Sequence, residues 1–321
     1  MRIGLIGYGY WGPNIAKNLH KLNVDFTVIV DSDHSKLSKL SYPKTILLNN
    51  INDALNHADA FIIATPIETH YSIAKYLLEN NKHVLIQKPM ADSSDKCKEL
   101  IDLSYKNNLT LMVAHTFLFS PPINKIKEDI NNNNYGDLNY IISTRINLGL
   151  FQRHHNVIWD LAPHDFSIIK YLYNEKPIAI SAVGKKHTEC QHIDCASISI
   201  LYNSNFMATI NVNWLSPIKV RNMIIGGQDK TVLYDDCSLD KIKIYDSGVE
   251  FNNDVFTYRK GDINIPRLDE KEPINYECIE FIKSIEKNKR SVSDGEFGLE
   301  VVKMIEAANK SILNNSAVIP I

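Results

Sequence analysis

The feature that most constrains the fold is a glycine-rich turn that directly follows a short apolar run near residue 1. Residues 2–6 are Arg-Ile-Gly-Leu-Ile, and Gly7, Gly9 and Gly12 follow with the spacing Gly-x-Gly-x-x-Gly. Gly7 allows a sharp turn out of a strand, Gly9 lets a ligand approach the backbone, and Gly12 lets the next helix pack closely. The spacing predicts a βαβ unit that holds a dinucleotide at the N-terminus of its helix.

The residues after the turn have the context that such a unit requires. Apolar residues recur at helical spacing, at Trp11, Ile15, Leu19 and Leu22. A second apolar run at 26–30 then ends in Asp31. An acidic residue there accepts hydrogen bonds from the adenosine ribose, and its charge repels a 2′-phosphate. Ser32 and Asp33 follow, and the first Lys or Arg is Lys36, so the sequence favours NAD over NADP.

Length and composition set the frame for the rest of the chain. A chain of 321 residues is longer than a single hydrophobic core usually contains, so we expect two domains. A net charge of −2, with 44% hydrophobic and 22% charged residues, gives no reason to expect a nucleic acid or membrane partner. The first strand starts at once, which leaves no room for a signal peptide, and the five cysteines form no Cys-x-x-Cys pair. We therefore expect a cytoplasmic protein.

Strand-like and helix-like segments alternate through the first part of the chain. Apolar runs occur at 45–48, 60–64, 83–86 and 110–113, and helical periodicity lies between them at 69–78 and 95–105. This alternation predicts a parallel sheet with helices on both faces, a Rossmann NAD-binding domain over residues 1–119. Ligands of such sheets bind beyond the carboxyl ends of the strands. The chemistry is therefore expected in three loops, at Thr65-Pro66, Gln87-Lys88-Pro89 and His115-Thr116.

The pattern becomes mostly strand-like after residue 120. Seven strand-like runs are found, at 138–147, 178–186, 196–202, 206–214, 220–226, 231–234 and 241–245. Helical stretches are expected from Pro121 to about 129, at 163–173, 273–287 and 297–313. Short turns between successive strands predict a large, mostly antiparallel open sheet in an α/β domain spanning 120–321, whose last helix packs back on the N-terminal domain. A sheet covered on one face predicts a homodimer or homotetramer through the other.

Three further motifs appear in a fixed order along the chain. Thr65-Pro66-x-x-x-His70 follows the fourth strand, Gln87-Lys88-Pro89 follows the fifth, and Asp160-Leu-Ala-Pro-His164 opens a helix of the second domain. Together with the glycine turn, these motifs resemble the glucose-fructose oxidoreductase, inositol dehydrogenase and MocA (Gfo/Idh/MocA) family of NAD(P)-dependent sugar oxidoreductases. The resemblance covers essentially the whole chain. It implies a Rossmann domain, a second α/β domain that mediates oligomerisation, and catalysis in the cleft between them.

The resemblance assigns the catalytic residues to Lys88, Asp160 and His164. Oxidation of a secondary alcohol requires removal of the hydroxyl proton, and histidine has a suitable pKa without perturbation. His164 is therefore interpreted as the base, although Lys88 remains an alternative. In this interpretation Lys88 stabilises the developing alkoxide, and Asp160, one helical turn before His164, orients the imidazole ring. The structural alternative makes Asp160 an N-cap and His164 a satisfied buried histidine.

The residues expected to bind the cofactor lie in the glycine turn and in the strand-end loops. They are Gly7, Tyr8, Gly9, Tyr10, Trp11, Gly12, Asp31, Ser32, Thr65, Pro66, His70, Gln87 and Lys88. His70 is expected near the nicotinamide ribose, with a helix-capping surface residue as the alternative. Gln87 departs from the family, in which glutamate is usual at this position. An amide keeps the hydrogen-bonding reach of glutamate but loses its charge, so the tuning of Lys88 is altered.

A polar cluster precedes the Asp160 motif and is expected to contact the substrate. Its members, together with Arg145 on the preceding strand, are Arg145, Gln152, Arg153, His155, Asn156, Trp159 and His164. Cationic and hydrogen-bonding groups suit a phosphorylated sugar or a nucleotide-sugar diphosphate. The alternative is a solvated polar loop.

One group of potential metal ligands lies outside these motifs. It consists of His187, Cys190, His192 and Cys195. The spacing matches no usual structural zinc site, and alternation in a hairpin would send these side chains to different faces. We therefore predict no metal.

The leading functional hypothesis is NAD-dependent oxidation of a secondary ring hydroxyl of a sugar. Within the family, the opening turn and the run 148–164 look most like bacterial enzymes that oxidise UDP-N-acetylglucosamine or its uronic acid at C3. That likeness implies a ketosugar destined for amination in surface polysaccharide synthesis. The alternatives are an NADPH-dependent ketosugar reductase of deoxysugar synthesis, a free polyol or inositol dehydrogenase, and a non-catalytic NAD-binding regulator. The joint presence of Lys88, Asp160 and His164 argues against the regulator.

Overall fold

The computed structural model describes residues 1–22, 24–38, 40–149, 151–152, 154–189, 191–252, 254–270 and 272–321. Within it the chain folds into two compact units. The first consists of Met1–Phe119 and Lys271–Lys303, and the second of Ser120–Glu270 and Met304–Ile321. The segment Lys271–Lys303 thus belongs with the nucleotide-binding motifs, whereas the sequence assigns it to the C-terminal domain.

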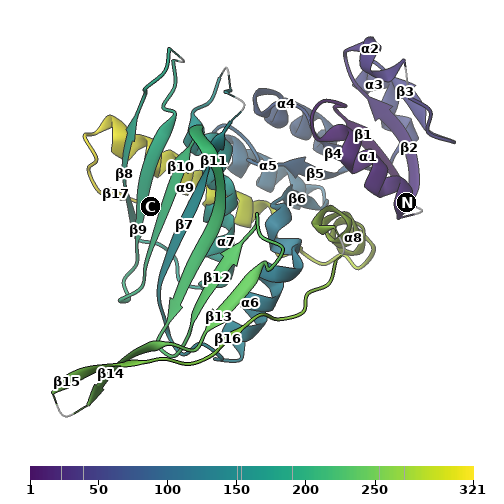
Figure 1. Ribbon diagram of the computed structural model, residues 1–321. Helices are drawn as coiled ribbons and strands as arrows, with labels where there is room; N and C mark the ends of the chain where they lie inside the picture. Colours follow the sequence, from purple (N-terminus) through teal and green to yellow (C-terminus); the bar gives the residue numbers. More distant parts are fainter. Residues whose placement is uncertain are drawn as a thin grey trace. The chain divides into compact units, whose positions relative to one another are not determined.

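The first unit is built on a six-stranded sheet with the strand order β3-β2-β1-β4-β5-β6 (Figure 1). Every pairing in it is parallel. Its strands are β1 (Arg2–Ile6), β2 (Asp25–Val30), β3 (Ile46–Leu48), β4 (Ala60–Ile63), β5 (His83–Gln87) and β6 (Leu111–Ala114). All residues of β4 and β6 are buried, as expected for parallel strands covered on both faces. The predicted Rossmann sheet is confirmed.

Helices connect these strands. They are α1 (Gly12–Lys21), α2 (His34–Leu37), α3 (Ile51–Ala54), η1 (Leu55–His57), α4 (Ile67–Glu79), α5 (Ser94–Lys106) and η2 (Thr116–Phe119). Each long helix buries an apolar stripe; in α1 this stripe contains Ile15 and Leu19. A later helix, α8 (Pro273–Glu286), belongs to the same unit. The boundary between the units lies within α9 (Gly295–Leu313).

The second unit contains a nine-stranded sheet with the order β16-β13-β12-β11-β7-β10-β9-β8-β17. Its strands are β7 (Leu138–Leu148), β8 (Ala179–Lys185), β9 (Cys195–Leu201), β10 (Met207–Asn213), β11 (Leu215–Gly227), β12 (Thr231–Asp235), β13 (Ile242–Tyr245), β16 (Ile263–Asn264) and β17 (Ile319–Pro320). Pairing is antiparallel except between β7 and β10, which are parallel because α7 (Val157–Leu172) connects β7 to β8. The expected mostly antiparallel sheet is confirmed, with this one parallel pair added.

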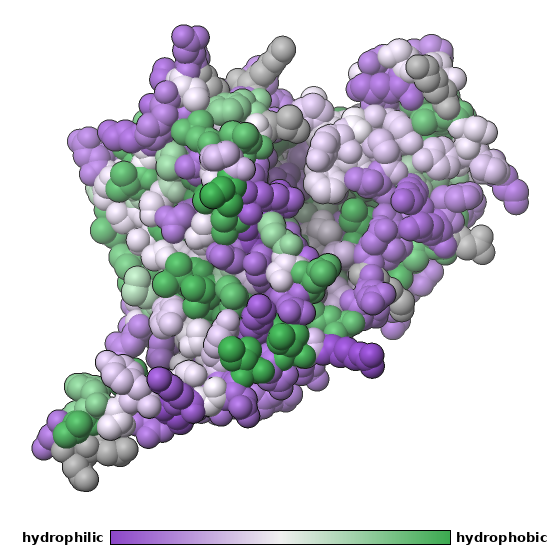
Figure 2. Space-filling view, in the orientation of Figure 1, coloured by the Kyte–Doolittle hydropathy of each residue, from purple (hydrophilic) through white to green (hydrophobic). Residues whose placement is uncertain are grey.

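The two faces of this sheet differ in burial, and alternation along each strand explains why. On β7, Ile141, Ser143 and Arg145 are buried, whereas Ile142 and Leu148 are 41% and 68% exposed. The buried face packs against α7, and α7 also packs against α6 (Pro121–Asn131). The other face carries no helix in Figure 1, and hydrophobic side chains are visible over it in Figure 2. This face is the open face of the sheet.

Two features of the second unit differ from the sequence-based expectation. Helix α7 begins at Val157 rather than at Pro163, because the Asn156 side chain caps it and Pro163 lies inside the helix. A further hairpin, β14 (Gly248–Asn252) and β15 (Val255–Arg259), forms a separate two-stranded sheet that projects from the unit (Figure 1). Among the described residues, no helix is long and apolar enough to cross a bilayer.

Candidate active site

The glycine turn lies between β1 and α1, and two of its three glycines are required by the chain itself. Gly7 has φ of 95°, and a Cβ there would lie 2.6 Å from the Ala64 carbonyl oxygen. A Cβ on Gly12 would lie 2.4 Å from the Gly7 carbonyl oxygen. A Cβ on Gly9, by contrast, would meet no atom within 4 Å. Nothing in the fold demands glycine at position 9, so its lack of a side chain fits the approach of a ligand to the backbone.

Asp31 lies at the carboxyl end of β2, beside the glycine turn. Its side chain is 7% exposed. One carboxylate oxygen accepts a hydrogen bond from the Tyr8 amide at 2.7 Å, and the other accepts one from the Asp33 amide at 2.9 Å. The Lys36 ammonium lies 3.3 Å from Oδ1. The carboxylate is therefore fixed in orientation, and a cation that is five residues away in the sequence lies next to it.

Aromatic side chains surround the glycine turn. Tyr10 and Trp11 are 74% and 43% exposed, and their rings meet edge to face with centroids 5.4 Å apart. The Tyr8 hydroxyl shares a hydrogen bond of 3.0 Å with the Tyr42 hydroxyl. Burial is the main cause that raises the pKa of Tyr8 above its ordinary value. Ser32 is exposed next to Asp31. Cofactor binding by Tyr8, Tyr10, Trp11 and Ser32 stays a prediction.

His70 ties together the loops that follow β4 and β5. Its ring is 1% exposed, so the surface helix-capping alternative is wrong. Nε2 lies 2.9 Å from the Thr65 carbonyl oxygen, and Nδ1 lies 2.9 Å from the Pro89 carbonyl oxygen. Burial lowers the pKa of His70, and the two carbonyl groups oppose that shift. His70 therefore lies between the backbones of the two loops, and its neutral ring donates to one of the two carbonyl oxygens. Pro66 is exposed at the start of α4.

Lys88 lies at the edge of the sheet where the cofactor is expected. It follows Gln87, which pairs with Ala114 of the neighbouring strand β6, so Lys88 and His115 leave the sheet side by side. The His115 ring is 1% exposed, and burial, with the Lys88 charge adding to the effect, lowers its pKa to about 3. A neutral imidazole therefore lies near the lysine on which the family resemblance places catalysis.

Asp160 and His164 lie one turn apart on α7. The helix is capped by Asn156, whose Oδ1 accepts hydrogen bonds from the amides of Ile158 and Trp159. Asp160 is in the first turn, so the alternative that made it the N-cap is wrong. Its Oδ2 accepts a hydrogen bond of 2.9 Å from the Trp214 indole, a partner that no local sequence signal indicates. His164 is half-buried.

Arg145 lies on the buried face of β7 and forms an ion pair with Asp165 of α7. Nε donates to Asp165 Oδ2 at 2.8 Å and Nη2 donates to Oδ1 at 3.1 Å, and both residues are nearly inaccessible. The Ser143 hydroxyl donates to the same carboxylate at 2.8 Å. Substrate contact by Arg145 stays a prediction, but this geometry makes the residue an anchor for the helix that carries His164.

The remaining residues expected to bind substrate precede or begin α7. Gln152 is exposed, and the rings of His155 and Trp159 lie 6.1 Å apart. Asn156 uses its oxygen for the cap and donates from Nδ2 to Asn309. Arg153 lies outside the described residues. The structure therefore gathers His155, Trp159 and His164 at one helix and gives Asn156 a structural role.

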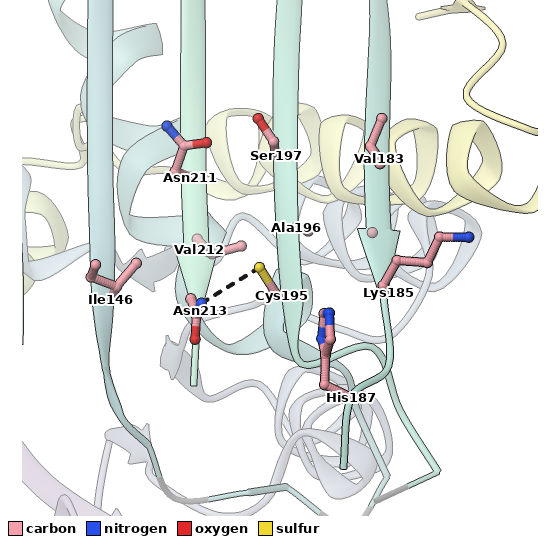
Figure 3. Close-up of a pocket in the computed structure, with 11 residues that line it drawn as sticks. Ile146, Val183, Lys185, His187, Cys195, Ala196, Ser197, Asn211, Val212 and Asn213 are labelled. Atoms are coloured by element: carbon pink, nitrogen blue, oxygen red, sulfur yellow. Dashed lines mark hydrogen bonds between the residues drawn. The ribbon is translucent and has the colours of Figure 1, made fainter. Parts of the chain in front are cut away.

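A pocket of about 230 Å³ lies on the open face of the sheet, away from α7 (Figure 3). Its walls include Lys185, His187, Cys195 and Asn213, and the Asn213 amide donates to the Cys195 sulfur at 3.5 Å. His187 instead pairs with Asp194, at 2.8 Å. Cys190 lies outside the described residues. Among the residues that are described, no group of three or more His, Cys, Asp or Glu side chains could hold a metal ion.

The parallel sheet, the open space at Gly9 and the oriented Asp31 carboxylate define a class: a protein with a dinucleotide-binding domain of Rossmann type. Comparison with protein-family models identifies the family within this class. Residues 1–115 match the model described as oxidoreductase family, NAD-binding Rossmann fold, and residues 124–232 match the Gfo/Idh/MocA C-terminal domain. The chain belongs to the Gfo/Idh/MocA family of oxidoreductases.

Curated relatives and solved structures agree with this membership. A UDP-N-acetylglucosamine 3-dehydrogenase from Acidithiobacillus ferrooxidans is 22% identical over 316 residues, 94% of each chain. Its solved structure has a TM-score of 0.81 and covers 98% of this chain and 99% of its own. An inositol 2-dehydrogenase from Rhizobium meliloti is 21% identical over 57% of this chain and 58% of its own. GenD2 from gentamicin A biosynthesis, in complex with NAD, has a TM-score of 0.85 at 16% identity and covers 100% of this chain and 96% of its own.

Proposed function

We propose that this enzyme oxidises a secondary ring hydroxyl of a UDP-linked N-acetyl sugar at C3, with NAD as the hydride acceptor. The observation that carries the proposal is the pair of Asp160 and His164, one turn apart on a capped and anchored helix. The relative of similar length that oxidises UDP-N-acetylglucosamine supports the choice of substrate. The ketosugar product would be a substrate for amination in surface polysaccharide synthesis.

The proposed chemistry assigns one task to each side chain. NAD, when bound, accepts the hydride. His164 accepts the hydroxyl proton, because an imidazole titrates near neutral pH without perturbation. Lys88 donates a hydrogen bond to the same oxygen and stabilises the negative charge that develops on it. Asp160 orients the imidazole from the preceding turn of α7. Gln87 hydrogen-bonds without adding charge next to Lys88.

The direct test incubates the purified protein with NAD and a panel of UDP- and dTDP-sugars and follows the absorbance of reduced cofactor. Oxidation at C3 can be unfavourable at equilibrium, so the assay includes an aminotransferase that removes the ketosugar. We expect reduction of NAD with UDP-N-acetylglucosamine or its uronic acid. Reduction only with free inositol or another free polyol would contradict the nucleotide-sugar proposal.

Two variants test the catalytic assignment separately from binding. We expect Lys88→Ala and His164→Asn to lower kcat by at least about a hundredfold, because each removes a group that acts on the reacting oxygen. Binding of NAD, followed by titration, should stay within about threefold of wild type for His164→Asn. Full turnover in either variant would show that the assigned residue is not catalytic.

The second candidate, an NADPH-dependent ketosugar reductase, is favoured by one observation. The Lys36 ammonium lies 3.3 Å from Asp31 Oδ1 and partly offsets the charge that would repel a 2′-phosphate. Replacing Lys36 by Met should therefore weaken NADP binding about tenfold and change NAD binding by less than about threefold. Parallel titrations of both cofactors check this. Wild-type protein that binds NADP more tightly than NAD would support the reductase.

A further inference from the structure

Trp214 is buried on the same side of the sheet as α7. It directly follows β10, and its side chain is 0% exposed. Alternation along the strand sends Asn213 to the open face, where Figure 3 shows it at the wall of the pocket, and sends Trp214 to the face covered by α7. A tryptophan at the end of β10 thus reaches the helix that carries the proposed catalytic residues.

The indole makes its one hydrogen bond to Asp160. Nε1–H is the only polar group of a tryptophan side chain, and a buried N–H requires a partner. Its partner is Asp160 Oδ2, at 2.9 Å. A hydrogen bond to a carboxylate is stronger than one between neutral groups, and it restricts rotation of the carboxylate about its own bond.

The surrounding chain is shaped to hold the indole in this position. A Cβ on Gly149 would lie 2.4 Å from Trp214 Cδ1, so the backbone passes against the ring where only glycine fits. The Gly149 amide donates to the Trp214 carbonyl at 3.0 Å, and the Trp214 amide donates to the Asp194 carbonyl at 3.0 Å. The Phe151 ring packs against the indole, with centroids 5.3 Å apart. The indole is therefore fixed from several sides before it contacts Asp160.

We propose that Trp214 is a positioning residue for the oxidation: it fixes the Asp160 carboxylate so that the carboxylate presents one orientation to His164. This inference rests on the proposed function, because it gives Trp214 its role through the catalytic pair. A tryptophan that only filled the core would affect stability in the same way but would act independently of Asp160.

A double-mutant cycle separates these two roles. The variants are Trp214→Phe, Asp160→Ala and both together, assayed with NAD and the UDP-sugar oxidised by the wild type. We expect Trp214→Phe to lower kcat about ten- to hundredfold with the KM for NAD unchanged, as for the loss of a hydrogen bond to a charged group. In the Asp160→Ala background the same substitution should change kcat less than about twofold. An equal fall in both backgrounds would overturn the proposal.

The matched control is Phe206→Leu, which removes a buried aromatic ring at the opposite end of β10. It tests for a general loss of stability and should leave kcat unchanged. A spectroscopic measurement requires no substrate, and it does not depend on whether the Trp214 variant folds. The protein has three tryptophans, Trp11, Trp159 and Trp214. In a ¹⁵N spectrum assigned with the help of Trp159→Phe, Asp160→Ala should shift the indole N–H resonance of Trp214 more than that of Trp159, because only the Trp214 indole donates to the Asp160 carboxylate.

The two kinds of failure are distinguishable. If the wild type oxidises no sugar, the proposed function fails, whereas the indole spectrum still reports whether Trp214 and Asp160 are bonded. If the wild type is active and Asp160→Ala leaves every indole resonance in place, the positioning role is overturned while the proposed function stands.

Discussion

At the scale of single residues, the three glycines of the opening turn are required for different reasons. Gly7 and Gly12 are enclosed by backbone atoms, so the fold cannot accept a side chain there. Gly9 faces open space, so no atom of the described chain excludes a side chain there, and we expect a bound cofactor to do so. A motif that the sequence presents as one unit therefore divides into two glycines that the fold requires and one, Gly9, that it does not.

This division predicts opposite results for two alanine variants. Gly9→Ala should leave the Tm within about 1 °C of wild type and weaken NAD binding at least about tenfold, because its Cβ meets only the ligand. Gly12→Ala should lower the Tm by several degrees, because its Cβ would lie 2.4 Å from the Gly7 carbonyl oxygen. Thermal unfolding and NAD titration measure the two effects. Normal NAD binding by Gly9→Ala would contradict the cofactor assignment.

At the scale of elements, side chains from several neighbouring segments hold α7 in place. Asn156 caps its first turn, Trp214 bonds to Asp160, and Arg145 and Ser143 hold Asp165. These contacts restrain the rotation of the helix about its axis. The direction in which His164 points is therefore decided by partners on β7 and just after β10 as well as by the helix itself.

The Arg145–Asp165 pair allows a stability test. Arg145→Met should lower the free energy of unfolding by about 3–5 kcal/mol, because it leaves a carboxylate buried without its cation. The double variant Arg145→Met with Asp165→Leu should recover at least half of that loss, because no unpaired charge remains. Urea unfolding of the wild type and these variants checks this. A double variant that is as unstable as the single variant, or less stable, would refute the account.

At the scale of the whole molecule, buried ionisable groups set the response to pH. Burial raises the pKa of Glu277 on α8 to about 8, against the hydrogen bond from Thr116, and lowers that of His115 to about 3. Both side chains are neutral in the folded protein near pH 6. The unfolded chain ionises the glutamate above about pH 4.5 and protonates the histidine below about pH 6.5. The combined contribution of these two groups to stability is therefore expected to be greatest between about pH 4.5 and 6.5.

The raised pKa of Glu277 makes the folded protein less stable as the pH rises. The folded state keeps its proton up to about pH 8, whereas the unfolded state loses it near pH 4.5, so stability falls as pH rises through that window. Between pH 4.5 and 8 the Glu277 carboxyl should lower the free energy of unfolding of the wild type by about 4 kcal/mol, and Glu277→Gln should abolish this decrease. Urea unfolding at several pH values measures it, with the exposed Glu286→Gln as control. An unchanged pH dependence in Glu277→Gln would contradict the assignment.

The open face of the nine-stranded sheet carries the prediction of self-association. Ile142 and Ile224 pair across β7 and β11 and are 41% and 36% exposed. We expect the wild type to be a dimer or tetramer. Ile142→Glu should lower the molar mass of the assembly in solution, because it would bury a charge without a partner in the interface between subunits. Light scattering after size-exclusion chromatography measures this, with exposed Ile46→Glu in β3 as control. A monomeric wild type at micromolar concentration would disprove the prediction.

Much of the fold is predictable because its signals are local. The strands of the first sheet follow from short continuous apolar runs, the strands from β7 to β13 from period-two alternation, and the helices from period-3.6 spacing. The predicted start of α7 is wrong because a proline usually marks the first turn of a helix, whereas Pro163 lies in its interior. The cap that decides the start is Asn156, a residue that the sequence pattern assigns to substrate binding.

The sequence by itself determined the six parallel strands, the glycine turn with Asp31, the large second sheet, and the order of motifs that marks the family. Only the tertiary structure decided which glycine faces open space, that Lys36 lies beside Asp31, that Arg145 is paired with Asp165, and that Trp214 bonds to Asp160. The physical reason is the distance along the sequence over which each kind of interaction acts. Periodicity and turns depend on neighbouring residues, whereas a buried charge or N–H takes its partner from whichever element the packing brings against it.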